Sequence, residues 1–105
     1  MWVFTKSGFL SAVSIKGRIV VRGRSRGHLE SFRKRHKIRA AIHRRRFADY
    51  EWRMFVGRAA WARAMAEEAS SIDYPNFKNA AREAYPLHLL PDIWTRVKDA
   101  LECRG

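Results

Sequence analysis

Residues 16–46 carry the whole net charge of this chain, and this restricts where its hydrophobic core can come from. The segment contains 13 of the 22 Lys and Arg residues but one of the 10 acidic residues, Glu30, so it accounts for the net charge of +12. Of the 13 aromatic residues, Phe32 alone lies inside it. Because charged side chains are rarely buried without partners, we expect the core to come from the two ends of the chain, with the basic segment laid over it.

Length and cysteine content favour one small cytoplasmic domain. A chain of 105 residues with 47% hydrophobic residues can form one domain, 1–105, with residues 16–46 as its basic surface segment. The one cysteine, Cys103, excludes an internal disulfide and a zinc site made of cysteines. Lys6 and Gly8 interrupt the first apolar stretch, which is therefore too short for a signal peptide or a membrane span. We expect no membrane partner.

The N-terminal part predicts a three-stranded meander. Three stretches rich in β-branched and aromatic residues are separated by short turn sequences: residues 2–5, 9–15 and 18–24. Along the second stretch two sets of side chains alternate: Phe9, Ser11, Val13 and Ile15 against Leu10, Ala12 and Ser14. One face of the sheet is therefore more apolar than the other, and we expect helices to pack on that face.

A short helix is predicted over residues 26–35, with Ser25 as its N-cap and Leu29 and Phe32 on its buried side. The next residues, 37–43, fit two structures. Their apolar and polar residues alternate as in a strand, whereas a helix continued from residue 26 would also align several apolar residues. We favour the strand, because the helix would leave two isoleucines on its solvated face.

A second hairpin and a long helix are predicted next. Alternation over residues 49–56 indicates a strand, joined to the one at 37–43 by a turn at Arg44–Arg46. From residue 58 the period changes to 3.6, which predicts a helix over 58–70. Its apolar stripe contains Trp61, Ala64, Met65, Ala69 and Ile72.

Two further helices complete the predicted fold. Asp73 as a cap and Pro75 in the first turn indicate a helix over 74–84, and a last helix over 91–102 is expected to end at Arg104–Gly105. The last helix is expected to bury Ile93, Trp94, Val97, Ala100 and Leu101. The prediction is a single small α+β domain of about five mostly antiparallel strands, with three to four helices packed on one face.

Arginine dominates the basic segment, and this favours phosphate as the ligand. Ten of its 13 basic residues are arginine, whose guanidinium group binds phosphate oxygens in pairs and stacks on bases. A solvated surface enriched in arginine by a GC-rich genome is the alternative. The predicted binding residues are Arg18, Arg22, Arg24, Arg26, Arg33, Lys34, Arg35, Lys37, Arg39, Arg44, Arg45 and Arg46.

Two parts of the segment are candidates for close contact with a backbone. Gly23 and Gly27, within Arg22–Gly27, allow a phosphate to approach the start of a helix, although an ordinary flexible connection also explains them. Arg44–Arg46 can enter a groove from a hairpin tip, unless it is simply a solvated tip.

Aromatic residues are scarce within the segment, which argues against a surface that stacks many bases. Phe47, Tyr50 and Trp52 flank it, but aromatic residues at strand spacing usually belong to the core. We therefore expect binding that reads backbone and shape rather than base sequence.

The sequence carries no pattern that predicts catalysis, a metal or a cofactor. The four histidines, His28, His36, His43 and His88, have no metal-ligand spacing and are better explained as structural residues. Glu67 and Glu68 are adjacent and should point to different faces of their helix, and Asp73 is better explained as a cap. We expect a protein that is not an enzyme.

Two blocks of the chain resemble a family of small uncharacterised bacterial proteins. The first is Met1–Thr5 followed by Gly8–Val13, and the second runs from Asp49–Arg53 through the helix around Trp61 to Ile72–Ala80. The resemblance covers about two thirds of the chain and implies one domain with a hairpin followed by a helix, but no known activity. The basic segment and the residues after Ala84 depart from the family pattern, as in a copy carried by a phage or mobile element.

The leading hypothesis is non-enzymatic binding of nucleic acid, RNA or DNA, or of a ribonucleoprotein, through an ordered arginine-rich surface. The alternative is an inhibitor of the anti-CRISPR type, made by a phage or mobile element, that binds a protein or nucleoprotein effector complex.

Overall fold

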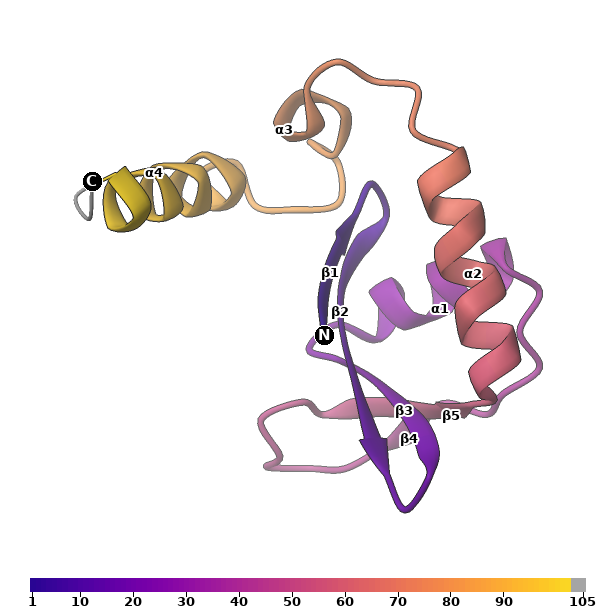
Figure 1. Ribbon diagram of the computed structural model, residues 1–105. Coiled ribbons are helices and arrows are strands. Elements are labelled where there is room, and N and C mark those ends of the chain that lie inside the picture. The colour runs from indigo at the N-terminus through magenta and orange to yellow at the C-terminus, as the bar shows by residue number, and fades with distance from the viewer. Residues whose placement is uncertain (103–105) are drawn as a thin grey trace.

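A five-stranded antiparallel sheet forms the framework of the protein (Figure 1). The computed structural model describes residues 1–102. Its strands are β1 (Trp2–Thr5), β2 (Gly8–Ile15), β3 (Arg18–Gly23), β4 (His43–Arg44) and β5 (Trp52–Val56). Its helices are α1 (Arg26–Arg35), α2 (Arg58–Ser70), α3 (Phe77–Ala80) and α4 (Leu89–Glu102). The predicted α+β class is confirmed. Cys103 and the predicted helix end at Arg104–Gly105 lie outside the described residues.

The order of the strands places part of the basic segment at the centre of the sheet. The order is β1-β2-β3-β5-β4, so β3 is the middle strand. The predicted meander β1-β2-β3 is confirmed. On its other side β3 pairs with β5, where Val21 is opposite Met54, and β4 pairs with the outer side of β5.

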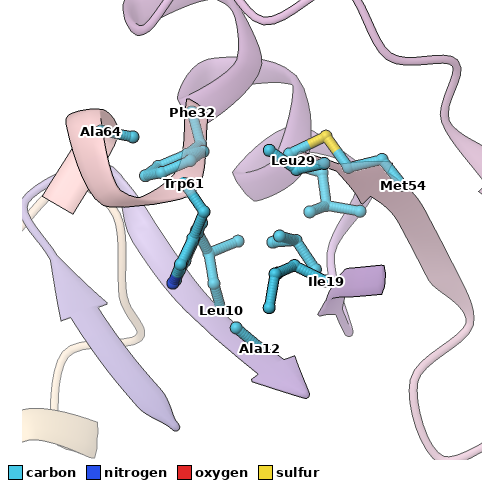
Figure 2. Close-up of a cluster of buried hydrophobic side chains, with 10 residues drawn as sticks. Leu10, Ala12, Ile19, Leu29, Phe32, Met54, Trp61 and Ala64 are labelled. Atoms are coloured by element: carbon cyan, nitrogen blue, oxygen red, sulfur yellow. The ribbon is translucent and has the colours of Figure 1, made fainter. Parts of the chain in front are cut away.

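The basic segment supplies part of the main hydrophobic core, so the prediction that it is laid over a core from the two chain ends is wrong (Figure 2). The cluster contains Leu10, Ala12, Ile19, Val21, Leu29, Phe32, Met54, Val56, Trp61 and Ala64. Apolar residues of the segment recur at a spacing of two along β3 and of three along α1. Each element can therefore bury one face and expose its charges on the other.

Helices α1 and α2 pack on the face of the sheet that carries Leu10. A second, smaller cluster forms on Phe4 and Phe9, which point to the opposite side of the β1–β2 hairpin, and includes Tyr85. The Oη atom of Tyr85 donates a buried hydrogen bond to the carbonyl oxygen of Thr5 at 2.8 Å. The C-terminal part of the chain is therefore attached to the hairpin and does not share the surface that α2 covers.

Helix α1 ends because Lys37 adopts a left-handed backbone conformation, with φ 52°. The N–H of Ile38 donates to the carbonyl of Arg33 at 3.0 Å, and the N–H of Lys37 donates to that of Lys34 at 3.3 Å. This Schellman motif turns the chain away from the helix axis. It excludes the alternative of a helix continued from residue 26, and the predicted N-cap, Ser25, is confirmed at the other end.

The strand predicted over residues 37–43 is wrong except at its end, since β4 contains only His43–Arg44. The alternation itself is present: Ile38, Ala40 and Ile42 are partly buried against the main core. Alternation reports which side chains face the core, whereas a strand also needs a partner at hydrogen-bonding distance. The second hairpin is confirmed as β4–β5, but its predicted turn at Arg44–Arg46 is wrong, because Arg44 belongs to β4 and β5 begins only at Trp52.

Helix α2 has the predicted bounds, but the helix predicted over 74–84 is reduced to α3 and a turn. Asn76 is its N-cap, because the Oδ1 atom of Asn76 accepts from the N–H of Asn79 at 3.1 Å. The predicted cap Asp73 forms an ion pair with Lys6 at 3.2 Å instead.

Helix α4 begins at Leu89 and extends away from the sheet (Figure 1). Its predicted burial is wrong for most of the stripe: Trp94, Val97 and Leu101 are 55%, 50% and 64% exposed. An amphipathic pattern indicates that a helix has one apolar face, but not that the chain provides a surface to cover it. Of the helices within residues 1–102, none combines the length and apolar content required to cross a bilayer.

Candidate nucleic-acid interface

The sheet brings together the two ends of the basic segment, which are distant in the sequence. Trp52 on β5 pairs with Gly23 on β3 and, on its other side, with Arg44 on β4. The residues around Gly23 therefore lie beside the β4–β5 hairpin, where Arg22 is opposite Arg53 and Arg44 lies over the ring of Trp52.

Four guanidinium groups lie over two aromatic rings in this region. The Cζ atoms of Arg22 and Arg24 lie 4.5 and 5.1 Å from the ring centroid of Tyr50. Those of Arg26 and Arg44 both lie 5.2 Å from the ring of Trp52. These distances are within the range of cation–π attraction. We call the following residues the arginine–aromatic cluster: Arg22, Arg24, Arg26, Arg44, Arg45, Arg53, Tyr50 and Trp52.

The two aromatic residues of the cluster were predicted to belong to the core, and the structure gives them two roles. Tyr50 is buried, and Trp52 packs against the main core. Both rings are also covered by arginines. The two rings are held in place by packing, and each holds its guanidinium groups near a fixed position. The cluster is therefore an ordered cationic surface rather than a flexible charged tail.

Arg22 and Arg53 are direct partners on β3 and β5, although like charges in this arrangement repel each other. The Nη2 atom of Arg22 donates to Oγ of Ser11 at 2.9 Å. Within residues 1–102 the Nε atoms of both arginines are buried without a hydrogen-bond partner. Burial, followed by the charges of Arg45 and Arg22, holds the pKa of Arg53 below its usual range. Holding these cations together costs stability.

Two carboxylates lie at the edge of the cluster and neutralise part of it. Arg26 contacts Glu30 and Arg44 contacts Glu51, both at 2.7 Å. All four side chains are at least 34% exposed, so water weakens both pairs. In the described part of the chain, five arginines of this region form no ion pair: Arg22, Arg24, Arg45, Arg46 and Arg53.

The loop between β4 and β5 carries the cluster beyond the end of the sheet (Figure 1). The N–H of Arg45 donates to the carbonyl of Glu51 at 2.7 Å, and that of Ala48 donates to Arg45 at 3.3 Å. Arg46 and Phe47 are exposed at the tip. The prediction that Phe47 belongs to the core is wrong, because the strand begins only at residue 52.

Arg18 lies on the same face as Arg22 but at the other end of β3. Four residues of extended strand separate the two by about 13 Å. The Cζ atom of Arg18 lies 4.3 Å from the ring of Phe55. Arg18 is therefore at the edge of the basic surface and outside the cluster.

The remaining predicted binding residues form a separate group at the C-terminal end of α1: Arg33, Lys34, Arg35, Lys37 and Arg39. About 13 Å of helix separates this end from Arg26. Two of the five have structural contacts. Arg33 donates to the carbonyl of Ala40 at 2.9 Å, and Arg35 donates to Oγ of Ser71 at 2.8 Å and lies 3.4 Å from Glu68. Lys34, Lys37 and Arg39 are exposed.

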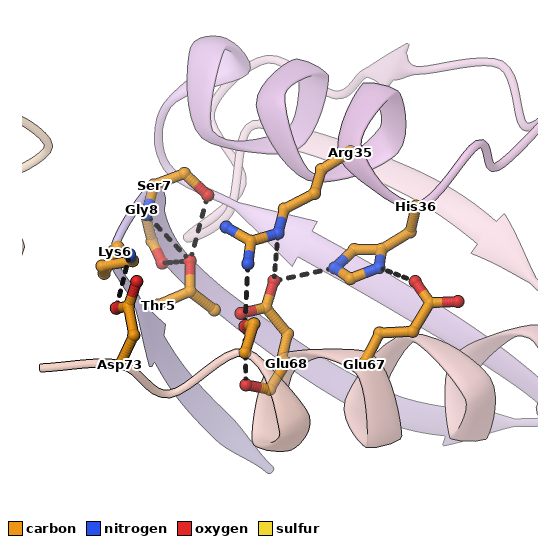
Figure 3. Close-up of polar contacts among 10 residues, drawn as sticks. Thr5, Lys6, Ser7, Gly8, Arg35, His36, Glu67, Glu68 and Asp73 are labelled. Carbon is orange, nitrogen blue, oxygen red and sulfur yellow. Dashed lines mark hydrogen bonds and ion pairs between the residues drawn. The ribbon is translucent and has the colours of Figure 1, made fainter.

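His36 connects α1 to α2 and is fully occupied by that contact (Figure 3). Its Nδ1 and Nε2 atoms each lie 2.7 Å from a carboxylate oxygen, of Glu67 and Glu68 respectively. The prediction that the two glutamates point to different faces is wrong here, because the ring lies between them. Both nitrogens are used and the ring is buried, so this triad has a structural role.

Gly23, one of the two glycines that suggested a phosphate cradle, is explained by packing. A Cβ atom there would lie 3.2 Å from the side chain of Leu29 and 3.3 Å from the carbonyl of Ser25. Gly23 lets α1 begin close to the end of β3, and its presence does not by itself indicate a ligand.

Sequence reasoning missed Arg53 and the roles of Tyr50 and Trp52. Arg53 lies outside the basic segment, and its relationship to Arg22 depends on β5 pairing with β3. The alternation over residues 49–56 placed Arg53 and Trp52 on opposite faces of their strand. Nothing in the sequence showed that this strand pairs with β3.

Comparison with protein-family models, curated proteins and solved structures found no significant match to this chain.

Proposed function

We propose that this protein binds nucleic acid, free or within a ribonucleoprotein, through the arginine–aromatic cluster and the adjoining loop tip, without catalysing a reaction on it. The observation that carries the proposal is the pairing of Arg22 with Arg53 across two strands, with no carboxylate between them and both Nε atoms buried without a partner. A polyanion at this surface supplies the negative charge that the paired arginines lack.

The chemistry of the cluster favours phosphate groups in series over a single small anion. Arg24, Arg45 and Arg46 are exposed around Arg22 and Arg53 and form no ion pair within residues 1–102, so several anionic groups can be bound side by side. Tyr50 and Trp52 are already covered by the protein's own arginines. Contacts to the backbone, which carry no base sequence, therefore provide most of the affinity.

Salt dependence tests this proposal directly. Binding of a labelled duplex and of single-stranded RNA and DNA should weaken steeply with salt, with a slope of log K against log salt steeper than about −3. A flatter slope means that fewer than about four phosphates are engaged, which contradicts binding through the cluster.

A matched pair of variants tests the location of the site. Arg24→Gln with Arg45→Gln should reduce the magnitude of the salt slope by about 1.4 to 1.8, the value for two lost phosphate contacts. Arg82→Gln with Arg96→Gln removes the same charge from exposed positions outside the cluster, and the slope should not change. Equal effects of the two double variants would show that binding follows net charge alone.

Binding to a protein complex is the second candidate, favoured by the exposed apolar stripe of α4 with Trp94, Val97 and Leu101. We infer a cytoplasmic location for either partner. Protein isolated from its own host at low salt should carry absorbance at 260 nm that nuclease removes, and it should shift unrelated duplexes. Protein free of nucleic acid that captures one defined effector complex would favour an inhibitor of the anti-CRISPR type.

A further inference from the structure

Phe47 occupies the tip of the β4–β5 loop in a position that packing does not explain. Its side chain is fully exposed, at 102% of the reference area. Its backbone has φ 65°, in the left-handed region that is unfavourable for a bulky residue. A phenylalanine at this position therefore lowers the stability of the free protein without adding to the core.

Phe47 also differs from the other aromatic residues of the described chain. Among residues 1–102 it is the one aromatic residue whose ring has neither an aromatic neighbour nor a cation above it. Tyr50 and Trp52 are covered by arginines, and the exposed Trp94 lies beneath Lys78. The ring of Phe47 is therefore open to a flat ligand.

The residues around Phe47 fit a ligand that combines a flat apolar surface with phosphate. Arg45 and Arg46 precede it directly, and both are exposed without an ion pair in the described part of the chain. The Arg44–Glu51 pair at 2.7 Å and the backbone bond from Arg45 to Glu51 close the base of the loop. These contacts hold the base of the loop, and two exposed arginines directly precede Phe47 at its tip.

We propose that Phe47 stacks on a nucleobase while Arg45 and Arg46 contact the phosphates beside it. This inference rests on the proposed function and adds a base contact to a surface that otherwise contacts the backbone. Every base has a π-face, so the contact adds affinity with little sequence preference. The base is either unpaired in a single strand or part of a duplex step opened by the ring.

The test compares ligands that share a phosphate backbone and differ in their bases. One is a deoxythymidine strand of about eight nucleotides, within the site size of single-strand-binding surfaces. The other is an abasic phosphodiester strand of the same length. Phe47→Ala should weaken binding of the first by roughly 5- to 150-fold and leave the second unchanged, whereas Phe47→Trp should retain binding. An effect under twofold, or an equal effect on both strands, overturns the inference.

Failure of the proposed function gives a different result, because the unaltered protein then binds neither strand. If the protein uses a duplex step, Phe47→Ala should abolish a rise in 2-aminopurine fluorescence within a duplex. If the protein uses an unpaired base, Phe47→Ala should abolish the quenching of 2-aminopurine fluorescence in a single strand. If neither signal occurs with the unaltered protein, the ring contacts no base.

Phe47→Gly separates stacking from folding. Glycine adopts the left-handed conformation freely, so this variant should have an unfolding temperature no lower than that of the unaltered protein and the same weakened binding as Phe47→Ala. A lower unfolding temperature would show that Phe47 stabilises the fold and would contradict the inference.

Discussion

The Nδ1 atom of His36 lies 2.7 Å from a carboxylate oxygen of Glu67, across the contact between α1 and α2. Its Nε2 atom makes the same contact with Glu68. The ring also packs on Phe32, with centroids 4.5 Å apart. One side chain therefore joins the basic helix to α2 by hydrogen bonds and by packing.

Removal of this ring should destabilise the protein. His36→Ala leaves a cavity beside Phe32 and leaves Glu68, whose side chain is 15% exposed, without its closest hydrogen-bond donor. We expect a loss of about 2–4 kcal/mol in the free energy of unfolding, measured with urea. His88→Ala, at an exposed position, is the control and should change little. A loss below about 1 kcal/mol for His36→Ala would contradict the structural role of the triad.

Stability should fall in acid through Glu67. The hydrogen bond from His36 is the main cause that lowers the pKa of the Glu67 carboxyl, and the charges of His36, Arg63 and Lys37 add to it, while burial opposes it. The pKa of Glu67 is lower in the folded state, so its ionised carboxylate stabilises the fold. This stabilisation is present above the ordinary pKa of 4.5 and is lost as pH falls through the folded pKa.

Glu67→Gln tests the source of this acid sensitivity. The amide oxygen still accepts a hydrogen bond but does not titrate, so the free energy of unfolding should depend less on pH below 4.5 than in the unaltered protein. The exposed Glu83→Gln serves as the control and should keep the original dependence. Identical acid profiles for all three proteins would exclude Glu67 as the titrating group.

The hydrogen bond from Tyr85 to Thr5 should contribute to the attachment of the C-terminal part of the chain. Tyr85→Phe removes a buried donor and leaves the carbonyl of Thr5 without it, which should cost about 1–2 kcal/mol in the free energy of unfolding. Tyr74→Phe is the matched control at a half-buried position. Equal losses in the two variants would mean that the bond adds nothing specific.

Tyr85 also predicts a loss of stability in alkali. Burial raises the pKa of its phenol, so the neutral form is favoured in the folded state. The stabilisation from the neutral phenol is fully present below the pKa of about 10 that the phenol has in the unfolded chain. It is lost as pH rises towards the pKa of the phenol in the folded state. Unfolding measured between neutral and alkaline pH should show this fall, and Tyr85→Phe should reduce it.

Lys37→Gly should stabilise the protein, because Lys37 has a positive φ at the end of α1. We expect a gain of about 0.5–1 kcal/mol in the free energy of unfolding. Lys34→Gly, one turn earlier and inside the helix, should instead cost about 1 kcal/mol. The two Lys-to-Gly changes should therefore shift the free energy of unfolding in opposite directions, although both lie in the same basic run. A loss in both variants would contradict the Schellman motif.

Local patterns were sufficient to predict most elements of the fold. Period-two alternation predicted β2 and β5, Ser25 predicted the start of α1, and the change to period 3.6 at residue 58 predicted α2. These features depend on neighbours within a few residues, which the sequence contains. The errors occur at Lys37, where a positive φ ends α1, and at Asp73, which pairs with Lys6 rather than capping a helix.

The sequence by itself determined that residues 16–46 are strongly cationic and arginine-rich, since charge is a property of composition. Only the tertiary structure decided that β3, within this segment, is the middle strand of the sheet and that Arg22 faces Arg53. It also decided that Phe47 is exposed while Tyr50 and Trp52 are covered by arginines. The physical reason is strand pairing: backbone hydrogen bonds join β3 to β5 across about 30 residues of chain, and no local pattern specifies which strands pair.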